Sequence, residues 1–401
     1  MKLAVLGLGG VGRVIAKTAA RTKKFEEVIC ADVDRETVDS LIKAVESRNF
    51  KGETVDASDF RQVSLLAEQA DILINATVPR FNLIVMEACL AGNCHYIDLA
   101  CDSLLNIPGK IDISAQLAMD KKFKEADLLA LCGIGIDPGC SNIFARYLSD
   151  RLDTVEEILV RDADVSYVDG YKLALYFSPD TFIDEVCSED PLFYENGEFI
   201  TREPLQVLEE FTFPEPVGKV KVYGVSHEEA WTLPRYIKKD GLKRCNFGYG
   251  LADELMTMME IFKTLGLDSS EPIIVNNAPV IPRDVITELL PRPADLAGKI
   301  KGNVCVGTLV SGYKDGKKVV KFMYNTVNHE EAYRAMQEQG TSYQTGIPAA
   351  LAADLLAEGI IKTRGAVPPE ALDPEVFVER LPEYGMKVGI EDRTPQNLVA
   401  S

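Results

Sequence analysis

The chain has 401 residues, of which 46% are apolar and 26% are charged. At about 100 to 200 residues per domain this length predicts two or three domains, and the composition excludes collagen-like, disordered and disulfide-scaffold proteins. With 43 basic and 62 acidic residues the net charge is -19, so we expect no nucleic acid and no membrane as a partner, because both favour basic surfaces.

The first third of the chain alternates short apolar runs with amphipathic stretches. The apolar runs predict strands at 3–6, 28–32, 54–56, 72–75, 95–99 and 128–131. The amphipathic stretches predict helices at 11–22, 35–48, 60–68, 83–91 and 111–124. Repeated strand-helix units with right-handed crossovers form a parallel, doubly wound sheet, so we predict an α/β fold with a Rossmann domain.

After residue 140 the pattern becomes typical of a mixed or antiparallel sheet. It predicts strands at 155–160, 172–177, 219–225 and 304–313, and helices at 252–265 and 330–339. Asn196-Gly197 and Asp315-Gly316 predict hairpin turns. We therefore predict a second, α+β domain. Two further helices are predicted at 348–358, with proline at its start and Gly359 past its end, and at 374–381.

The segment from Gly7 to Gly12 joins the first predicted strand to the first predicted helix in a Gly-x-Gly-x-x-Gly pattern. Gly7 permits a tight turn, Gly9 lets a pyrophosphate approach backbone amides, and Gly12 lets helix and strand pack closely. Gly10 and Val11 complete the start of the helix. The pattern predicts a dinucleotide site, and a coincidental glycine-rich turn is the alternative.

Asp32 lies 20 residues after Gly12, at the end of the second predicted strand. Its carboxylate can accept hydrogen bonds from the adenosine ribose hydroxyls and would repel a 2′-phosphate, so we expect NAD(H) as the cofactor. Asp34 belongs to the same acidic turn. Arg35 could pair with such a phosphate, which keeps NADP(H) open.

Residues that close the third and fourth predicted strands should line the rest of the dinucleotide. Asp56 and Ala57 are expected beside the adenine. The path toward the nicotinamide is expected to be lined by Asn75, Ala76, Thr77 and Pro79.

Two acids are predicted at the carboxyl ends of later strands, where ligands of open α/β sheets bind. Asp98 ends the fifth strand, and Asp137 follows the sixth in a loop with Gly133, Gly135 and Gly139. We predict catalytic roles for both acids and a ligand contact for Gly135, because the glycines suggest a backbone held close to a ligand. The alternatives are a helix cap for Asp98 and a turn before proline for Asp137.

Cys140 begins another predicted helix, whose N-terminus either faces a substrate carboxylate or is simply capped by Ser141 or Asn142. The nine cysteines include no Cys-x-x-Cys pair, and no segment resembles a signal peptide or reaches the ~18 apolar residues of a membrane span. The cytoplasm is therefore the expected compartment.

The chain has three histidines, His95, His227 and His329, and none has zinc-motif spacing, so we expect no metal site. His227 and His329 each precede two glutamates, which is typical of a solvated helix start. His227 also has the pKa range needed for proton transfer.

Together these motifs resemble the saccharopine dehydrogenase family over essentially the whole chain. Besides the glycine loop, the likeness lies in segments 86–92 (Met-Glu-Ala-Cys-Leu-Ala-Gly), 96–98 (Tyr-Ile-Asp), 135–139 (Gly-Ile-Asp-Pro-Gly) and 345–348 (Thr-Gly-Ile-Pro). The chain is most similar to the carboxynorspermidine/carboxyspermidine dehydrogenase branch at 226–229 (Ser-His-Glu-Glu), 313–316 (Tyr-Lys-Asp-Gly) and 324–333.

The resemblance implies a Rossmann domain over 1–140, an inserted substrate domain over 141–340, and C-terminal helices within 341–401 that return to the first domain. It implies hydride transfer between nicotinamide and the imine formed from an amine and a semialdehyde, as in polyamine or lysine metabolism. Asp137 then corresponds to the aspartate of the family's catalytic loop. That branch carries Ser-Arg after the second strand and uses NADP(H), whereas this chain has Asp32-Val33-Asp34.

The resemblance also indicates which residues of this chain fall at the substrate-binding positions of the family. Fungal saccharopine dehydrogenases place a cysteine where Asp162 or Asp164 falls, and bind the substrate carboxylate with an Arg-Tyr pair, for which Arg244 is the nearest basic residue here. An acidic site suits a diamine or diamino acid. We therefore count as substrate-binding candidates Asp102, Cys140, Asp162, Asp164 and Arg244.

The chemistry requires a group that handles the proton of the substrate nitrogen. Hydride leaves an amine carbon only when the nitrogen is uncharged, and an alkyl ammonium has a pKa of ~10.4. We expect Asp137 or His227 to accept the proton, with Asp98 as the orienting group or ammonium partner. We expect a homodimer. Three alternatives stay open: a lysine ω-amine dehydrogenase, an alcohol or aldehyde dehydrogenase, and a non-catalytic NAD-binding redox sensor.

Overall fold

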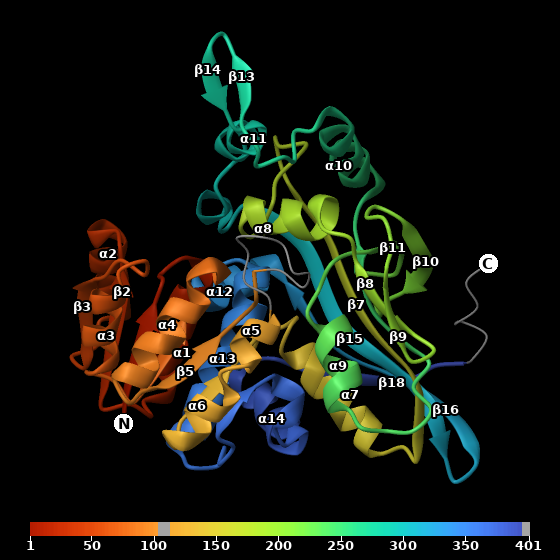
Figure 1. Cartoon of the computed structure of the whole chain (residues 1–401), viewed down its shortest axis with the longest axis horizontal. Helices are drawn as coiled ribbons and strands as arrows, with labels where there is room; N and C mark the ends of the chain where they lie inside the picture. Colours follow the sequence, from red (N-terminus) through yellow and green to blue (C-terminus); the bar gives the residue numbers. More distant parts are fainter. Residues whose placement is uncertain (103–112, 395–401) are drawn as a thin grey trace. The chain divides into compact units, whose positions relative to one another are not determined.

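The computed structural model describes residues 1–102 and 113–394 (Figure 1). The chain forms two compact units. The Rossmann unit comprises Met1–Ile143 and Ser342–Lys387, and the inserted unit comprises Phe144–Thr341 and Val388–Ser401. Within the C-terminal segment, residues up to Lys387 belong to the Rossmann unit, and the last strand pairs within the inserted unit.

The Rossmann unit contains seven strands in the order β17-β6-β5-β4-β1-β2-β3. The pairings in this sheet are parallel. Its strands are β1 Lys2–Leu6, β2 Glu27–Asp32, β3 Phe50–Thr54, β4 Ile72–Asn75, β5 His95–Asp98, β6 Leu129–Leu131 and β17 Gly365–Val367. Apart from β17, this is the strand order of the doubly wound dinucleotide fold, which confirms the predicted α/β class.

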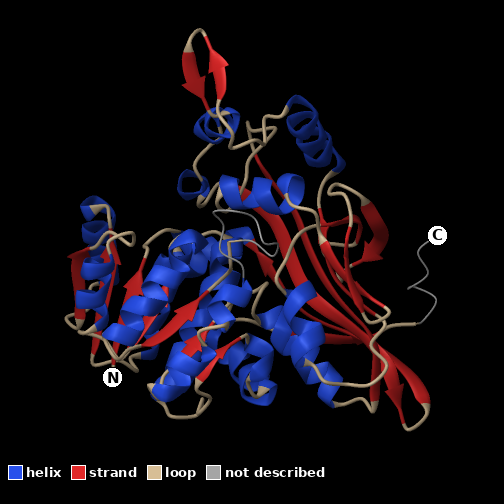
Figure 2. Ribbon diagram, viewed as in Figure 1, coloured by secondary structure: helices blue, strands red, loops and turns tan. Residues whose placement is uncertain are grey.

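Helices connect successive strands of this sheet (Figure 2). They are α1 Gly10–Thr22, α2 Arg35–Val45, α3 Phe60–Ala67, α4 Asn82–Ala91, α5 Ile113–Leu117 and α6 Asp120–Glu125. The unit also contains α14 Pro374–Arg380 and most of α13 Gly340–Ala357, whereas α7 Cys140–Asp150 begins in this unit and belongs mostly to the inserted one. The residues of β1 from Leu3 to Leu6 are at most 1% exposed. Central strands buried on both faces read as apolar runs, which is why the sequence pattern located them.

Three predicted elements of this unit have different bounds. The third strand ends at Thr54 rather than Asp56, whose carboxylate instead holds a turn by bonding Ser58. The helix predicted at 111–124 is two short helices, α5 and α6, and its first two residues lie outside the described residues. Helix α13 begins at Gly340, well before Pro348, and packs closely on α1: a Cβ at Gly346 would lie 2.8 Å from Val14.

The inserted unit is built on a mixed sheet of nine strands, as predicted. Its main path is β10-β11-β12-β7-β15-β16-β18, and β8 pairs with β12 and β9. β12 and β7 are parallel, and the neighbouring pairings are antiparallel. Its strands are β7 Thr154–Val168, β8 Leu192–Glu195, β9 Glu198–Thr201, β10 Val207–Thr212, β11 Lys219–Gly224, β12 Arg244–Gly250, β15 Ile300–Lys314, β16 Lys317–Asn328 and β18 Val388–Asp392.

The remaining elements of this unit are short. Strands β13 Ile273–Val275 and β14 Ala278–Val280 form a separate hairpin. The helices are α8 Pro179–Ile183, α9 Glu229–Tyr236, α10 Asp253–Leu265, α11 Pro282–Leu289 and α12 His329–Met336. None of the helices in the described ranges has the length and apolar character needed to cross a bilayer.

Both predicted hairpin turns are confirmed. Asn196 and Gly197 join β8 to β9 with φ of 50° and 97°, and Asp315 and Gly316 join β15 to β16 with φ of 51° and 72°. Two successive positive φ values suit the right-handed twist of the flanking strands, and Asn-Gly and Asp-Gly tolerate them best.

The predicted strand at 172–177 is wrong. This segment has no strand partner, and all six of its residues line a pocket. The pattern that predicts a strand at 172–177 therefore belongs to a loop that borders a cavity.

Candidate functional site

The glycine loop lies between β1 and α1, as the sequence predicted. Gly7 has φ of 91°, and a Cβ there would lie 2.7 Å from the backbone of Ala76. A Cβ at Gly12 would lie 1.9 Å from the carbonyl oxygen of Gly7. A Cβ at Gly9 would meet no protein atom within 4 Å. Internal packing thus explains Gly7 and Gly12, whereas Gly9 fits a position kept small for an approaching phosphate.

The carboxylate of Asp32 is joined to this loop. The backbone N–H of Leu8 donates to Asp32 Oδ2 at 2.7 Å, and that of Asp34 donates to Oδ1 at 3.0 Å. The first turn of α1 contains no acidic residue, so the free N–H groups of the helix N-terminus can attract an anion. The residues present therefore fit a dinucleotide with its pyrophosphate at α1 and its ribose at Asp32.

Asp34 and Arg35 have local partners. Asp34 caps α2 by accepting from the backbone N–H groups of Glu36 and Thr37, and the hydroxyl of Thr37 contributes most to lowering the pKa of its carboxyl. Arg35 forms an ion pair with Asp39 at 2.7 Å, one helical turn along α2. The side chains of this pair are 60% and 59% exposed, so a bound phosphate could still compete for Arg35.

The loop after β4 lies against the glycine loop. Asn75 is buried, and its Oδ1 accepts from the backbone N–H and the hydroxyl of Thr77 at 3.2 and 2.6 Å. Ala76 is the residue against which a Cβ at Gly7 would collide. Pro79 begins a short 3-10 turn. The segment is therefore placed beside the dinucleotide motif.

Asp56 and Ala57 lie just past β3. The hydroxyl and then the backbone N–H of Ser58 lower the pKa of the Asp56 carboxyl, which accepts from them at 2.7 and 2.8 Å. Ala57 is buried. The structure thus puts both residues on the predicted edge of the sheet, and their contact with an adenine stays a prediction.

Asp98 is enclosed at the end of β5 and is 1% exposed. Its Oδ2 accepts from the hydroxyl of Tyr96 at 2.7 Å and from Nε2 of Gln116 at 2.5 Å. Its Oδ1 accepts from the backbone N–H of Gly133 at 2.5 Å. The carboxylate therefore ties β5 to the loop after β6, which favours an orienting role over contact with a substrate ammonium.

Asp137 lies in that loop, between β6 and α7. The backbone N–H of Gly135 donates to the carbonyl of Pro138 at 2.7 Å, and a Cβ at Gly139 would lie 2.0 Å from the carbonyl oxygen of Gly135. These glycines are thus required by the turn itself. Within residues 131–140 only Asp137 is not fully buried, although its Oδ2 atom is, and the loop places this residue at the carboxyl edge of the sheet.

Cys140 begins α7 as predicted and is fully buried. Burial, with a smaller effect from the charge of Asp137, raises the pKa of its thiol well above the usual range, so it stays neutral. Asn142 Oδ1 accepts from the backbone N–H of Gly139 at 2.8 Å, and Asn142 Nδ2 donates to Glu370 at 3.0 Å. These bonds favour the capping interpretation of this helix start.

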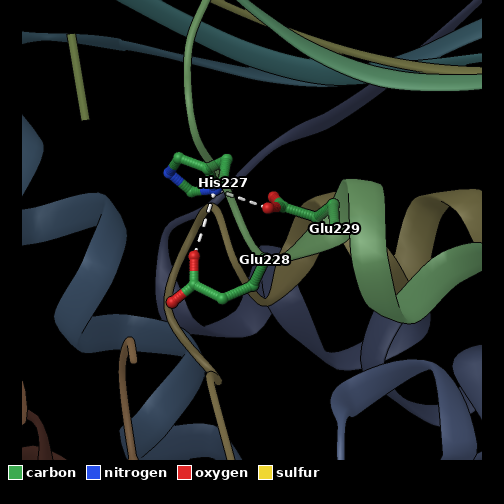
Figure 3. Close-up of side chains that lie close together, drawn as sticks. All are labelled: His227, Glu228 and Glu229. Carbon is green, nitrogen blue, oxygen red and sulfur yellow. Dashed lines mark hydrogen bonds and ion pairs between the residues drawn. The ribbon is translucent and has the colours of Figure 1, made fainter. Parts of the chain in front are cut away.

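His227, Glu228 and Glu229 form a buried cluster at the start of α9. Figure 3 shows both carboxylates directed at Nδ1 of the imidazole, at 2.5 Å for Glu229 and 3.4 Å for Glu228. The ring stacks on Phe247 with centroids 3.9 Å apart. The expected solvated helix start is therefore wrong here, because the aromatic ring and the sheet cover the histidine.

The carboxylates determine the charge of His227. Burial alone would lower its pKa, but the charge and hydrogen bond of Glu229, with the charges of Glu228 and Glu185, raise it well above the ordinary value. The side chain is therefore an imidazolium at neutral pH and can donate a proton. The three potential ligand atoms lie within 4.8 Å of one another, as metal ligands would. A charged imidazole paired with two carboxylates also accounts for the cluster, as a buried ion pair.

His329 is also buried, at 1% exposure, and the solvated interpretation is wrong for it as well. Its Nδ1 accepts from the backbone N–H of Gly340 at 3.0 Å, and its Nε2 lies 3.6 Å from Oδ2 of Asp164. Asp162 and Asp164 lie two residues apart on β7, and side chains so spaced share one face of a strand.

Two other substrate candidates lie elsewhere. Arg244 on β12 forms an ion pair with Glu157 on the adjacent β7 at 2.9 Å, which gives it a structural role in the sheet. Asp102 is half-buried at the edge of the described residues.

Comparison with known proteins agrees with this geometry. Residues 3–131 match the saccharopine dehydrogenase NADP binding domain, and residues 135–386 match the saccharopine dehydrogenase C-terminal domain. The chain belongs to the saccharopine dehydrogenase family. It is an NAD(P)-binding oxidoreductase of that family, which confirms the resemblance found in the motifs.

Relatives within the saccharopine dehydrogenase family match at full length. Carboxynorspermidine synthases of Vibrio alginolyticus and Vibrio cholerae are each 32% identical over 98% of both chains. A carboxyaminopropylagmatine dehydrogenase of Synechocystis is 29% identical over 96% of both. The fold is similar to that of apo saccharopine dehydrogenase (L-Glu forming) from Saccharomyces cerevisiae, with a TM-score of 0.75, 13% identity and coverage of 98% of this chain and 100% of that one.

Within the two units of this saccharopine dehydrogenase family member, sequence reasoning missed several residues that contact the predicted site residues. Tyr96 supports Asp98 from two positions earlier on the same strand, and strand periodicity alone could have indicated it. Gln116 supports the same carboxylate from α5, and no local pattern marks it. Phe247 covers His227 from a strand that the sequence pattern did not reveal.

Proposed function

We propose that this protein reduces the imine formed from an amine and a semialdehyde. The amine adds to the aldehyde carbon and water leaves, which forms the C=N bond. When bound, the reduced nicotinamide supplies the hydride that adds to the imine carbon while a proton adds to nitrogen, giving a secondary amine. The observation that carries the proposal is the 32% identity to carboxynorspermidine synthases over the full chain, together with an intact glycine loop.

The proposed amine is a diamine or a related polycation. The names of the relatives denote carboxylated polyamines, one of them built on agmatine. The net charge of -19 favours the approach of such cations. The proposed carbonyl partner is a semialdehyde that also carries a carboxylate.

The proposed cofactor is NAD(H). Asp32 is fixed by the Leu8 amide at 2.7 Å, and Asp34 adds a second negative charge to the same turn. A 2′-phosphate would face both carboxylates, whereas ribose hydroxyls would donate to them. Arg35 is the residue that could offset this repulsion, and it is already paired with Asp39.

Two residues are proposed to handle protons. His227 holds a proton at neutral pH and is suited to donate it in the reductive direction. Asp137 is presented at the carboxyl edge of the Rossmann sheet and is suited to accept a proton in the oxidative direction. Asp98 is proposed as a positioning residue, because it holds the loop of Asp137 through Gly133.

The proposed compartment is the cytoplasm. All nine cysteines are free and buried. Burial raises the pKa of Cys30 and Cys305 to about 12, so these thiols do not react readily. Free thiols in this number suit a reducing compartment.

A panel of substrates tests the proposal. The purified protein is mixed with NADH or NADPH, one semialdehyde and one amine, and oxidation of the cofactor is followed by absorbance. Aspartate semialdehyde with putrescine, 1,3-diaminopropane or agmatine should consume the cofactor only when both organic substrates are present. Consumption with free lysine and an oxidised cofactor alone would instead favour ω-amine oxidation.

A further inference from the structure

A pocket of about 230 Å³ lies within the inserted unit. It is lined by β7, the segment 171–177 and the start of α10. Its polar lining includes Asp164 and Ser166, and its walls include the rings of Tyr176, Phe182 and Tyr249. The pocket thus has polar side chains from β7 in its lining together with aromatic side chains.

The polar groups of this pocket are buried but incompletely bonded. The Asp164 side chain is 6% exposed. Among the described residues, none donates a hydrogen bond to Asp164 Oδ1 or to the Ser166 hydroxyl oxygen. The two residues are two positions apart on β7 and therefore share a face. Two acceptors are thus directed to one side of the strand.

Asp164 forms no ion pair with a lysine or an arginine in the described part of the chain. His329 Nε2 lies 3.6 Å from Asp164 Oδ2, but Nδ1 of the same ring accepts a backbone hydrogen bond from Gly340. A ring nitrogen that accepts carries no proton, so His329 is the neutral tautomer with its proton on Nε2. Its Nε2–H dipole can point toward the Asp164 carboxylate, but a neutral ring does not cancel the negative charge of that carboxylate.

The rest of the lining does not alter this balance. Lys172 and Glu254 both line the pocket and are exposed, so water screens their charges more than that of buried Asp164. Tyr176 stays a neutral phenol, because burial and the charge of Asp164 raise its pKa. A buried carboxylate without a counter-charge is unfavourable, so the pocket is best satisfied by a ligand that brings a positive charge.

We propose that this pocket binds the positively charged terminus of the amine substrate, with Asp164 as its counter-ion. An alkyl cation brings N–H donors for Asp164 Oδ1 and the Ser166 hydroxyl, and aromatic faces attract cations. The inference rests on the proposed function and deepens it, because it names the residue that holds the charged end of the amine. A terminal ammonium and a terminal guanidinium share this chemistry.

Calorimetric titration of the full chain tests the pocket. Putrescine and agmatine are titrated separately in the presence of saturating reduced cofactor, into the wild type, Asp164→Asn, Ser166→Ala and Asp169→Asn. Asp169 is the matched control, because it is an aspartate directly after the last residue of β7 that pairs with Lys301 at 2.7 Å on the surface and is 71% exposed. The two amines distinguish an ammonium from a guanidinium site.

Asp164→Asn should weaken binding of the preferred amine at least ~30-fold, as for loss of one partner of a buried charge pair. Ser166→Ala should weaken it ~10-fold, and Asp169→Asn should change it less than ~2-fold. Circular dichroism shows whether each variant is folded. If Asp164→Asn is unfolded, the amine affinity of Ser166→Ala alone tests the proposal. Wild-type affinity in both pocket variants, or no binding of either amine by the wild type, would overturn the proposal.

The test separates this inference from the proposed reaction. Binding that depends on Asp164, without cofactor oxidation for any semialdehyde, would reject the reaction and keep the pocket. If Asp164→Asn turns over a diamine with an unchanged KM, the proposed reaction is supported and the proposed amine site in the pocket is rejected.

Discussion

The backbone N–H of Leu8 donates a hydrogen bond to Asp32 Oδ2 at 2.7 Å. This contact joins the glycine loop to the acidic end of β2, so the loop and the Asp32 carboxylate, for which we propose ribose binding, form one structural group. The carboxylate is therefore placed for cofactor choice by the same backbone that is expected to receive the pyrophosphate.

Asp32→Ser should narrow the preference for NAD(H) over NADP(H) by at least ~10-fold, because it removes the charge that repels a 2′-phosphate. The readout is the ratio of kcat/KM for the two cofactors. Asp71→Asn is the matched control, because Asp71 also accepts a backbone N–H, that of Lys2 at 2.6 Å, but at the opposite end of the strands. An unchanged ratio in Asp32→Ser would place the ribose contact elsewhere.

Gly9→Ala and Gly12→Ala should have opposite consequences. Gly9 has φ of -64°, which alanine adopts readily, and its Cβ would meet no protein atom within 4 Å. We expect Gly9→Ala to fold with unchanged or slightly higher stability but to bind the cofactor at least ~10-fold more weakly. Gly12→Ala places a Cβ 1.9 Å from the Gly7 carbonyl oxygen and should lower the free energy of unfolding by about 1–3 kcal/mol.

Urea unfolding and cofactor fluorescence titration measure these two quantities. A Gly9→Ala variant that binds the cofactor like the wild type would show that no phosphate approaches this backbone.

Asp137→Asn should reduce turnover at least ~100-fold and leave cofactor affinity nearly unchanged, as expected for loss of general acid-base help. Asp98→Asn provides the comparison. It should lower the free energy of unfolding by about 1.5–3 kcal/mol, because the buried carboxylate accepts three hydrogen bonds. Single-turnover rates and urea unfolding separate the two effects. Near-normal rates in Asp137→Asn would remove this residue from the mechanism.

His227 should make stability depend on pH. The pKa in the folded state is raised above the unfolded value of ~6.5, so its contribution is complete below that pH and is lost as the pH rises through the folded value. The difference in unfolding free energy between the wild type and His227→Gln should therefore shrink as the pH rises. Urea unfolding of both proteins at a series of pH values from below ~6.5 upward measures this difference in unfolding free energy. A difference that is constant with pH would show that the folded protein does not hold a proton on this ring.

The sequence predicted the Rossmann sheet well because its strands are buried on both faces and its glycine loop has a fixed geometry. Asp32 and Asp137 could be placed because strand ends define the ligand edge of such a sheet. The hairpins at Asn196 and Asp315 were predictable because two successive positive φ values restrict the residue type.

Contacts between distant segments were not predictable. His227 was expected to be solvated, but Phe247 covers it from β12. The segment 172–177 alternates like a strand, yet its side chains line a pocket. Local periodicity reports which side chains are buried, and it does not report which distant element buries them.

The central claim is that this chain joins an amine to a semialdehyde by reducing the imine between them. Its most direct test incubates the protein with 4-deuterated reduced cofactor, aspartate semialdehyde and a diamine, and analyses the product by mass spectrometry. The account predicts a secondary amine that carries one deuterium on the former aldehyde carbon. Tight cofactor binding without any deuterated secondary amine, across the diamines and agmatine, would contradict it.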